Sequence, residues 1–399
     1  MYKLKKKRTI NIITDISLLS INVLLFLPKL ILDIFLKKDS LAISFPLFLS
    51  ILAYFFIPPI EYDLYRHYEN YQVFIYFERV DFIKDYSLLF LFYIGKLFNL
   101  APAFLPFISC FVMYYIWYNG LFKRISSSHN NFLFPVFFIL FFISIPLVLF
   151  TGIRFALGLA FVMQSLFFRD QGKQKLAYIF LLLAILTHFS LIVIALIIIA
   201  NPIIAKLNYS IRSIAIIAIT FSIPFQEEIS FLIIESIQWV NNKLFGWEAI
   251  STETYITGKW GVNSSNRLNE IGKLVQQIQT IGLLSIMILY HFLFAKYIEK
   301  KSNLFNNVTF ASIILCIITF NYYAIFDRYG IIVTLLISYN LITYFKYKLI
   351  SHISFVIFYF TYLLLFRIID FKNNFVVYDQ SYSDIFHLSL INTIYEMLL

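Results

Sequence analysis

Residues 131–150 read NFLFPVFFILFFISIPLVLF, and residues 151–169 continue as TGIRFALGLAFVMQSLFFR. A helix that crosses a bilayer needs roughly 20 predominantly apolar residues, and two stretches of about that length follow one another here. The rest of the chain is similar, with a mean hydropathy of +0.80, 60% hydrophobic residues and 14% charged residues. A water-soluble fold of 399 residues could not hide so much apolar surface. We therefore expect the bilayer to be the solvent of this chain.

The apolar runs predict an all-α, polytopic integral membrane bundle of about 10–12 spans. We expect one transmembrane domain over residues 1–399 rather than several water-soluble domains. Several runs are too short for a full crossing, so we expect some spans to be tilted, broken or re-entrant. The expected spans are 41–60, 102–119, 131–150, 152–169, 174–188, 189–204, 211–225, 278–297, 304–326, 329–345 and 350–368.

The basic residues orient this bundle, because short cytoplasmic connections of membrane proteins carry an excess of lysine and arginine. If the segment after residue 60 lies outside, every short inner connection is basic. This orientation makes 61–101 and 226–277 the large outer loops, with an amphipathic stretch at 86–100 at the outer interface. Residues 9–36 then make no net crossing, and lie along the inner surface or form a hairpin near Pro28-Lys29. The inner basic residues are Lys37, Lys38, Lys123, Arg124, Arg169, Lys173, Lys175, Lys206, Arg212, Lys296, Lys300, Lys301, Lys346 and Lys348.

The charged residues that this topology leaves on the outer side are the candidates for function, and none of them was used to choose it. Asp63, Arg66 and His67 fall within one helical turn, where a carboxylate, a guanidinium and an imidazole can bind anions and move protons. Each candidate also has a purely structural explanation: an interfacial belt, a snorkelling arginine or a hydrogen-bonded core histidine. The full set is Asp63, Arg66, His67, Arg154, His188, Arg267 and Arg328.

His188 interrupts an apolar stretch between two basic inner connections, 169–175 and 206–212. The chain must go out and back between them, which leaves about 15 residues, or about 22 Å of helix, for each leg. This is less than the roughly 30 Å of hydrocarbon in a bilayer. We therefore expect His188 at the turning point, at the floor of a cavity that opens to the outside.

Other kinds of site leave no pattern in the sequence. It contains no CxxC, HExxH, GxxxxGK[ST] or GxGxxG motif, so we expect no cofactor and no metal site. Cys110 and Cys316 lie within apolar runs and are expected to be buried thiols rather than a disulfide. The net charge of +10 comes mostly from short loops that orient the chain. We therefore expect a lipid bilayer, and no nucleic acid, as a partner.

Several of these motifs together resemble the EpsG/Wzy group of bacterial polysaccharide polymerases. DLYRHY at 63–68 looks like the aspartate- and tyrosine-rich first outer loop of that family, and an amphipathic segment follows at 85–100. TGIRFALGLA at 151–160 looks like its arginine-led helix, and AILTHFSL at 184–191 looks like its histidine motif. Arg328 resembles a late outer arginine. EYDL at 61–64 stands where the common form of the first motif is Gly-Thr-Asp-Tyr.

The resemblance implies a multi-pass glycosyltransferase of the GT-C type in the bacterial inner membrane. Such enzymes join polyprenyl-diphosphate-linked oligosaccharide repeat units on the outer face, in O-antigen, capsule or exopolysaccharide synthesis. A chain-length regulator and a flippase are the protein partners that this role suggests. Two functional alternatives remain open: a transporter or flippase of lipid-linked sugars, which should show related halves, and an O-antigen-type ligase. A non-catalytic assembly protein is a third.

The reaction assigns roles to the candidates. The transition state places negative charge on the leaving diphosphate, which fixed cations stabilise. We expect Arg154 and Arg328 to bind the diphosphate first of all, with Arg66 and Arg267 next. A carboxylate or imidazole should accept the proton of the attacking sugar hydroxyl. We expect Asp63 to do so, with His188 and His67 as alternatives.

Overall fold

The computed structural model gives helices throughout the part of the chain that it describes. The described residues are 2–60, 62–77, 86–122, 134–146, 152–225, 269–295, 303–344, 353–375 and 388–398, with short pieces at 149, 235, 238–239 and 243. All regular secondary structure in these ranges is helical. The all-α expectation is therefore confirmed for the described residues. The residues form two compact units, 1–191 with 363–399, and 192–362. The expectation of a single transmembrane domain stays a prediction.

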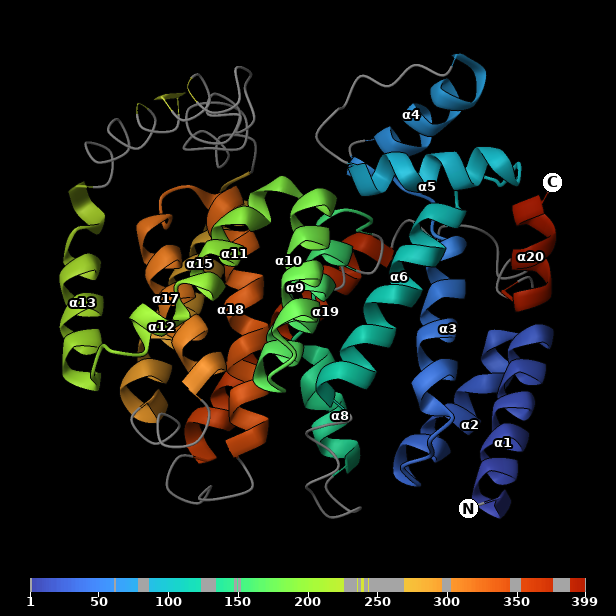
Figure 1. Cartoon of the computed structure of the whole chain (residues 1–399), viewed down its shortest axis with the longest axis horizontal. Coiled ribbons are helices and arrows are strands. Elements are labelled where there is room, and N and C mark those ends of the chain that lie inside the picture. The colour runs from blue at the N-terminus through green and yellow to red at the C-terminus, as the bar shows by residue number, and fades with distance from the viewer. Residues whose placement is uncertain are drawn as a thin grey trace. The chain divides into compact units, whose positions relative to one another are not determined.

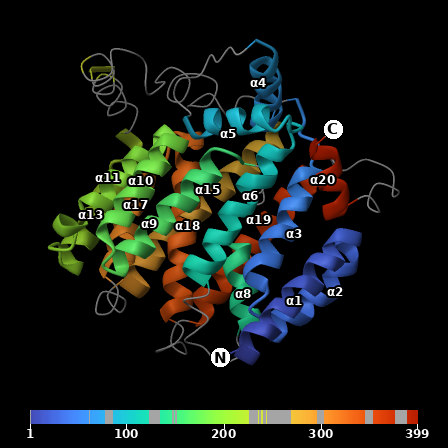
Figure 2. The ribbon, with the colours of Figure 1, turned by 45° about the vertical axis from the view of Figure 1, so that its right-hand side comes forward.

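The first unit is built around helices that run side by side (Figures 1 and 2). α9 packs most extensively against α10, and α6 packs against both α3 and α9. A short helix, α5, lies across one end of this group (Figure 1). The helices of the unit are α1 (Tyr2–Ile21), α2 (Val23–Phe35), α3 (Leu41–Tyr54), α4 (Asp63–Phe77), α5 (Tyr86–Leu97), α6 (Phe104–Ile116), α8 (Phe134–Ile143), α9 (Phe155–Asp170), α10 (Gln174–Thr187) and α20 (Leu390–Leu398).

The connections that carry Lys37 and Arg169 lie at one end of the first unit. The connection with Lys123 and Arg124 lies outside the described residues. The Lys37 ammonium, just after α2, lies 5.5 Å from the ring centre of Phe134, where α8 begins. The amide of Asn119, in the π-helical turn Trp117–Phe122 that extends α6, donates to the carbonyl of Ala42 at the start of α3. A side chain at Gly120 would meet Gln164 in the second half of α9. The start of α9, with Arg154, therefore lies at the opposite end from Lys37.

The N-terminal segment forms a helical hairpin. Asn22 caps α2 by accepting a hydrogen bond from the N–H of Leu24 at 2.7 Å, and α1 packs against α2. An ion pair joins Lys29 to Asp15 across the hairpin. The two residues lie equally far from Asn22 in the sequence, as expected when the turn is at Asn22. A hairpin was one of two expected arrangements, but its turn lies at Asn22 and not near Pro28-Lys29. Pro28 is accommodated inside α2.

The second unit contains longer helices and buried polar networks. Asn340 donates to the Tyr290 hydroxyl and to Thr309, each at 3.0 Å, which joins α18, α15 and α17. Its helices are α11 (Ile192–Ile199), α12 (Asn201–Ile204), α13 (Tyr209–Phe221), α15 (Glu270–Tyr290), α17 (Asn303–Ile318), α18 (Tyr323–Tyr344) and α19 (Ile353–Phe375), whose second half, from Leu363, belongs to the first unit.

Two helix boundaries in the second unit differ from the expected ones. α15 begins at Glu270, inside the expected outer loop 226–277, because Asn269 caps it by accepting from the N–H of Gly272 at 2.7 Å. Most of the rest of that loop, 226–268, lies outside the described residues. α18 begins at Tyr323, so Arg328 lies within the helix and not before it.

Among the described helices, two are long and apolar enough to cross a membrane, 270–294 and 323–343. A further nine apolar helices have 10–17 residues, among them 41–54, 174–187 and 209–221. The expectation that some spans are tilted, broken or re-entrant stays a prediction. A polytopic arrangement remains a prediction.

Candidate functional site

The site begins at the first residue of α4. The chain leaves α3, passes Pro58-Pro59, and turns at Tyr62, whose N–H donates to the carbonyl of Pro59 at 2.9 Å. Asp63 then occupies the first turn of α4, where a negative charge interacts favourably with the positive end of the helix. Because neighbours on a helix surface are three and four residues apart, Arg66 and His67 lie on the same side as Asp63.

The carboxylate of Asp63 is shared by three side chains. Its Oδ1 is paired with Nη2 of Arg66, on the same helix. Its Oδ2 is paired with Nη2 of Arg154, which is 91 positions away in the sequence. The same Oδ2 lies 3.1 Å from Nε2 of His67. Three of the predicted site residues therefore converge on a fourth.

A shared apolar cluster holds the two halves of this site together. Leu64, which follows Asp63, and Ile153, which precedes Arg154, are both buried in it. The same cluster includes Tyr71 and Phe74 from α4 and Phe92 from α5, with other side chains from α5 and α6 and with Phe56, which follows α3. Packing of Leu64 and Ile153 in this cluster therefore holds the backbone of Asp63 and Arg154 in place, so the ion pair does not depend on two flexible surface segments.

Burial and charge set the protonation states of the site. Burial alone would raise the pKa of Asp63, but the hydrogen bond from His67 and the charge of Arg154 outweigh it and hold that pKa well below its usual range. For His67, burial lowers the pKa, the bond to Asp63 opposes this, and the charges of Arg154 and Arg66 lower it further. His67 is thus neutral near pH 7, and its Nε2–H donates to Asp63. Its buried Nδ1 has no hydrogen-bond partner among the described residues.

The site carries an excess of positive charge. Two guanidinium groups face one carboxylate, and His67 is neutral. Arg154 also stands at the N-cap of α9, and its own side chain makes no capping hydrogen bond there. The N–H groups of the first helical turn and the helix dipole favour an anion at this position.

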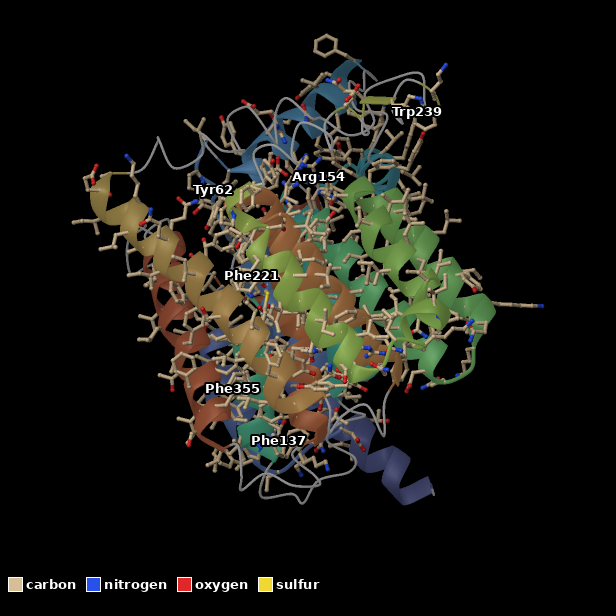
Figure 3. The ribbon with its side chains drawn as sticks, turned by 90° about the vertical axis from the view of Figure 1, so that its left-hand side faces the viewer. Tyr62, Phe137, Arg154, Phe221, Trp239 and Phe355 are labelled. Atoms are coloured by element: carbon tan, nitrogen blue, oxygen red, sulfur yellow. The ribbon has the colours of Figure 1, made fainter. Side chains whose placement is uncertain are left out.

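Figure 3 shows Arg154 and Tyr62 toward one end of the first unit and Phe137 of α8 toward the other.

His188 lies beside the same helix start. It is the first residue after α10, in an extended conformation, and Ser190 hydrogen-bonds its Nδ1 at 2.7 Å. Its ring packs edge-to-face on Phe155, the residue after Arg154, with 5.5 Å between ring centres. Gly158 leaves room for Leu191, whose Cδ1 would lie 2.5 Å from an added Cβ, whereas the Cβ of His188 would lie at an ordinary contact distance of 3.5 Å. α10 ends just before His188, and a 3-10 turn, Phe189–Leu191, follows it. The expected return of the chain and the expected cavity both stay predictions.

α5 is tied to this end of α10. The hydroxyls of Ser87 and Thr187 lie 2.8 Å apart, and Thr187 directly precedes His188. Neither Ser87, Thr187 nor Ser190 was among the expected site residues. Ser190 could have been found from its position two residues after a histidine, since short polar side chains often bond locally. The contact between Ser87 and Thr187 joins residues 100 positions apart and has no local signal.

The roles expected for the two remaining candidates, Arg328 and Arg267, stay predictions. Arg328 is half-buried on α18, in the second unit. Arg267 lies outside the described residues. Within the described ranges, no three His, Cys, Asp or Glu side chains gather as a metal site requires, and Cys110 and Cys316 are buried free thiols.

The comparisons with known proteins give no independent guide to function. The chain matches no protein-family model, and neither a curated protein nor a solved structure matches it.

Proposed function

We propose that this chain is a membrane glycosyltransferase that polymerises lipid-linked oligosaccharide repeat units, with a polyprenyl-diphosphate-linked glycan as the donor. One observation carries the proposal. Arg154 and Arg66, from two separate elements, meet at Asp63 beside the start of α9, and they keep one positive charge in excess. Guanidinium groups suit phosphate oxygens because their planar N–H donors can bind in pairs.

The exposed surface of the helices supports a membrane setting. Large apolar side chains point outward along several helices, which is unfavourable in water and favourable in lipid. On α10 these are Leu176, Ile179 and Leu182, and on α13 they include Ile214 and Ile217. Together with the basic residues at the end of the first unit opposite Arg154, they favour a multi-pass protein of the bacterial inner membrane whose site faces outward.

The site supplies the groups that glycosyl transfer requires. The acceptor hydroxyl oxygen forms a bond to the anomeric carbon, and the bond from that carbon to the diphosphate oxygen breaks. The lipid diphosphate leaves with the electron pair, and Arg154 and Arg66 stabilise its developing charge. Asp63, whose side chain is 53% exposed, accepts the hydroxyl proton. His67, which is buried, holds Asp63 in position through Nε2.

Arg154 provides the decisive test. Arg154→Ala should reduce glycan lengthening about 10²–10³-fold, the loss expected when one preorganised donor to a developing anion is removed. Arg154→Lys keeps the charge but loses the planar donor pair, so it should remain strongly impaired. The assay uses purified protein with polyprenyl-diphosphate-linked repeat units, and glycan length is read by mass spectrometry or gel electrophoresis.

The same two substitutions at Arg169, at the other end of α9, are the matched control and should leave lengthening near the wild-type rate. Near-normal lengthening by Arg154→Lys would instead mean that Arg154 only anchors the helix end. Movement of the lipid-linked unit across the bilayer without lengthening would indicate a flippase. Transfer to an acceptor that carries no diphosphate would indicate a ligase.

A further inference from the structure

The state of Asp63 conflicts with its use as a base unless its partners change. A carboxylate that accepts from two guanidinium groups and an imidazole N–H is stabilised as an anion and takes up a proton poorly. The structure indicates which partners can leave. The Arg66 side chain is 62% exposed and Asp63 is 53% exposed, whereas His67 is almost completely buried. The guanidinium groups can therefore exchange partners while His67 stays in place.

A diphosphate would compete directly for these guanidinium groups. Carboxylate and phosphate oxygens both accept from the same guanidinium N–H donors. The N–H donors of Arg66 and Arg154 that now bind Asp63 cannot bind a diphosphate oxygen at the same time. A diphosphate carries more negative charge than a carboxylate, and the positive end of α9 favours it further.

We propose that the Asp63 carboxylate is an internal competitor for the diphosphate site: the donor's diphosphate takes Arg154 and Arg66 from Asp63 and so releases the base. This inference rests on the proposed function and adds an order to it. After the exchange Asp63 keeps only His67 as a partner, and its pKa rises toward the usual range. It can then accept the proton of the acceptor hydroxyl while the C–O bond to the diphosphate breaks. The base is active only when a donor is bound.

The internal competition makes a prediction that a simple supporting role for Asp63 does not make. Asp63→Asn removes the competing charge and nearly preserves the shape, so it should bind inorganic pyrophosphate more tightly than the wild type, by about tenfold. It should also fail to lengthen glycans, because the base is lost. Binding is measured by calorimetry on the full chain in detergent, with sodium pyrophosphate and a chelator.

Three variants complete the experiment. Glu69→Gln removes another exposed carboxylate from α4 and should leave pyrophosphate binding within about twofold of the wild type. Arg154→Ala should lose most of the binding. Asp63→Ser replaces Asp63→Asn if the latter does not give a monodisperse preparation. For either neutral variant, saturating pyrophosphate should also raise the unfolding temperature more than it does for the wild type.

The outcomes separate this inference from the proposed function. If the wild type binds pyrophosphate and lengthens glycans but Asp63→Asn binds no more tightly, the competition is wrong and the function stands. If Asp63→Asn binds more tightly but the wild type lengthens no glycan, the competition stands and the function is wrong. If neither the wild type nor the neutral variants bind pyrophosphate, the anion site and both proposals fail together.

Discussion

At the scale of single residues, His67 is the most constrained part of the site. It is buried, and it faces the charges of Asp63, Arg66 and Arg154. Of the three side chains that bind the Asp63 carboxylate, His67 is the most deeply buried. Burial of a neutral imidazole costs little, whereas burial of an imidazolium beside two guanidinium groups costs much more. The folded protein therefore resists protonation of His67, and this links folding to pH.

The linkage predicts a pH-dependent stability with a definite sign. The pKa of His67 is lower in the folded protein than its ordinary value of about 6.5, so below that pH the unfolded chain takes up a proton that the folded chain refuses. Stability should fall as the pH drops from about 6.5 toward the lower folded-state pKa. In His67→Gln the unfolding temperature should decrease less between pH 7.5 and 5.5 than in the wild type.

The comparison of slopes isolates this one residue. Glu69→Gln, which changes an exposed group on the same helix, should keep the wild-type slope over that pH range, since a carboxyl group titrates mainly below it. Equal slopes for the wild type and His67→Gln, measured by thermal unfolding in detergent, would show that His67 is protonated as readily in the folded protein as in water.

The sequence identifies much of the site but not how its members pair. The spacing of Asp63, Arg66 and His67 places them together whenever that segment is helical. The positive-inside topology predicts that Asp63 and Arg154 lie on the same side of the membrane, but it does not predict that they form an ion pair. The pairing itself depends on the apolar cluster that includes Leu64 and Ile153, and such packing between distant segments leaves no periodic signal in the sequence.

At the scale of elements, Tyr71 of α4 packs closely against Gly95 of α5, the segment that follows α5, and the start of α6. The Tyr71 hydroxyl donates to the carbonyl of Leu100 at 2.8 Å, and the Tyr71 ring packs on Phe104 with 5.5 Å between ring centres. Gly95 makes room for both, because an added Cβ would come within 3.0 Å of the Tyr71 hydroxyl and the Phe104 ring. The orientation of α4, and with it Asp63, depends on the absence of a side chain at Gly95.

Gly95→Ala should therefore destabilise the protein despite the higher helix propensity of alanine. Overpacking of this kind costs about 1–3 kcal/mol, which exceeds the propensity gain of about 1 kcal/mol. The measurements are the unfolding temperature and glycan lengthening, both of which should decrease. Gly120→Ala is the control, because its Cβ would meet only the flexible end of Gln164. A Gly95→Ala protein as stable and active as Gly120→Ala would show that α4 is not held through Gly95.

The ends of the elements were harder to predict than their existence. The apolar runs at 152–169 and 174–188 correspond closely to α9 and α10. The polar first turns of α15 give no hydrophobic signal, so the apolar pattern predicts a start at 278 instead of Glu270. Asn269 is nevertheless a typical N-cap residue. The hairpin turn was expected at Pro28, but a proline in the first turns of a helix can remain inside it, and Asn22 supplies the cap instead.

At the scale of the whole molecule, the proposed function requires the cluster around Asp63 to face the outside. The basic residues give the expected orientation, in which the connection between α9 and α10 is inside and α4 is outside. A transmembrane helix has the same backbone structure whichever end faces the outside. Orientation is therefore a property that the distribution of lysine and arginine predicts and the fold alone does not. It can be measured independently of any enzymatic assay.

Single cysteines at two exposed positions test the orientation. Cysteine at Glu69, on α4, should react with a membrane-impermeant maleimide in intact spheroplasts, whereas cysteine at Gln171, between α9 and α10, should react only after permeabilisation. The two natural cysteines are buried and can remain in place, and the wild-type chain measures their background. The reverse pattern would place Arg154 and Asp63 on the cytoplasmic side, where a polymerase of externally displayed repeat units could not use them. Labelling of both positions from outside would mean that α9 does not cross the membrane at all.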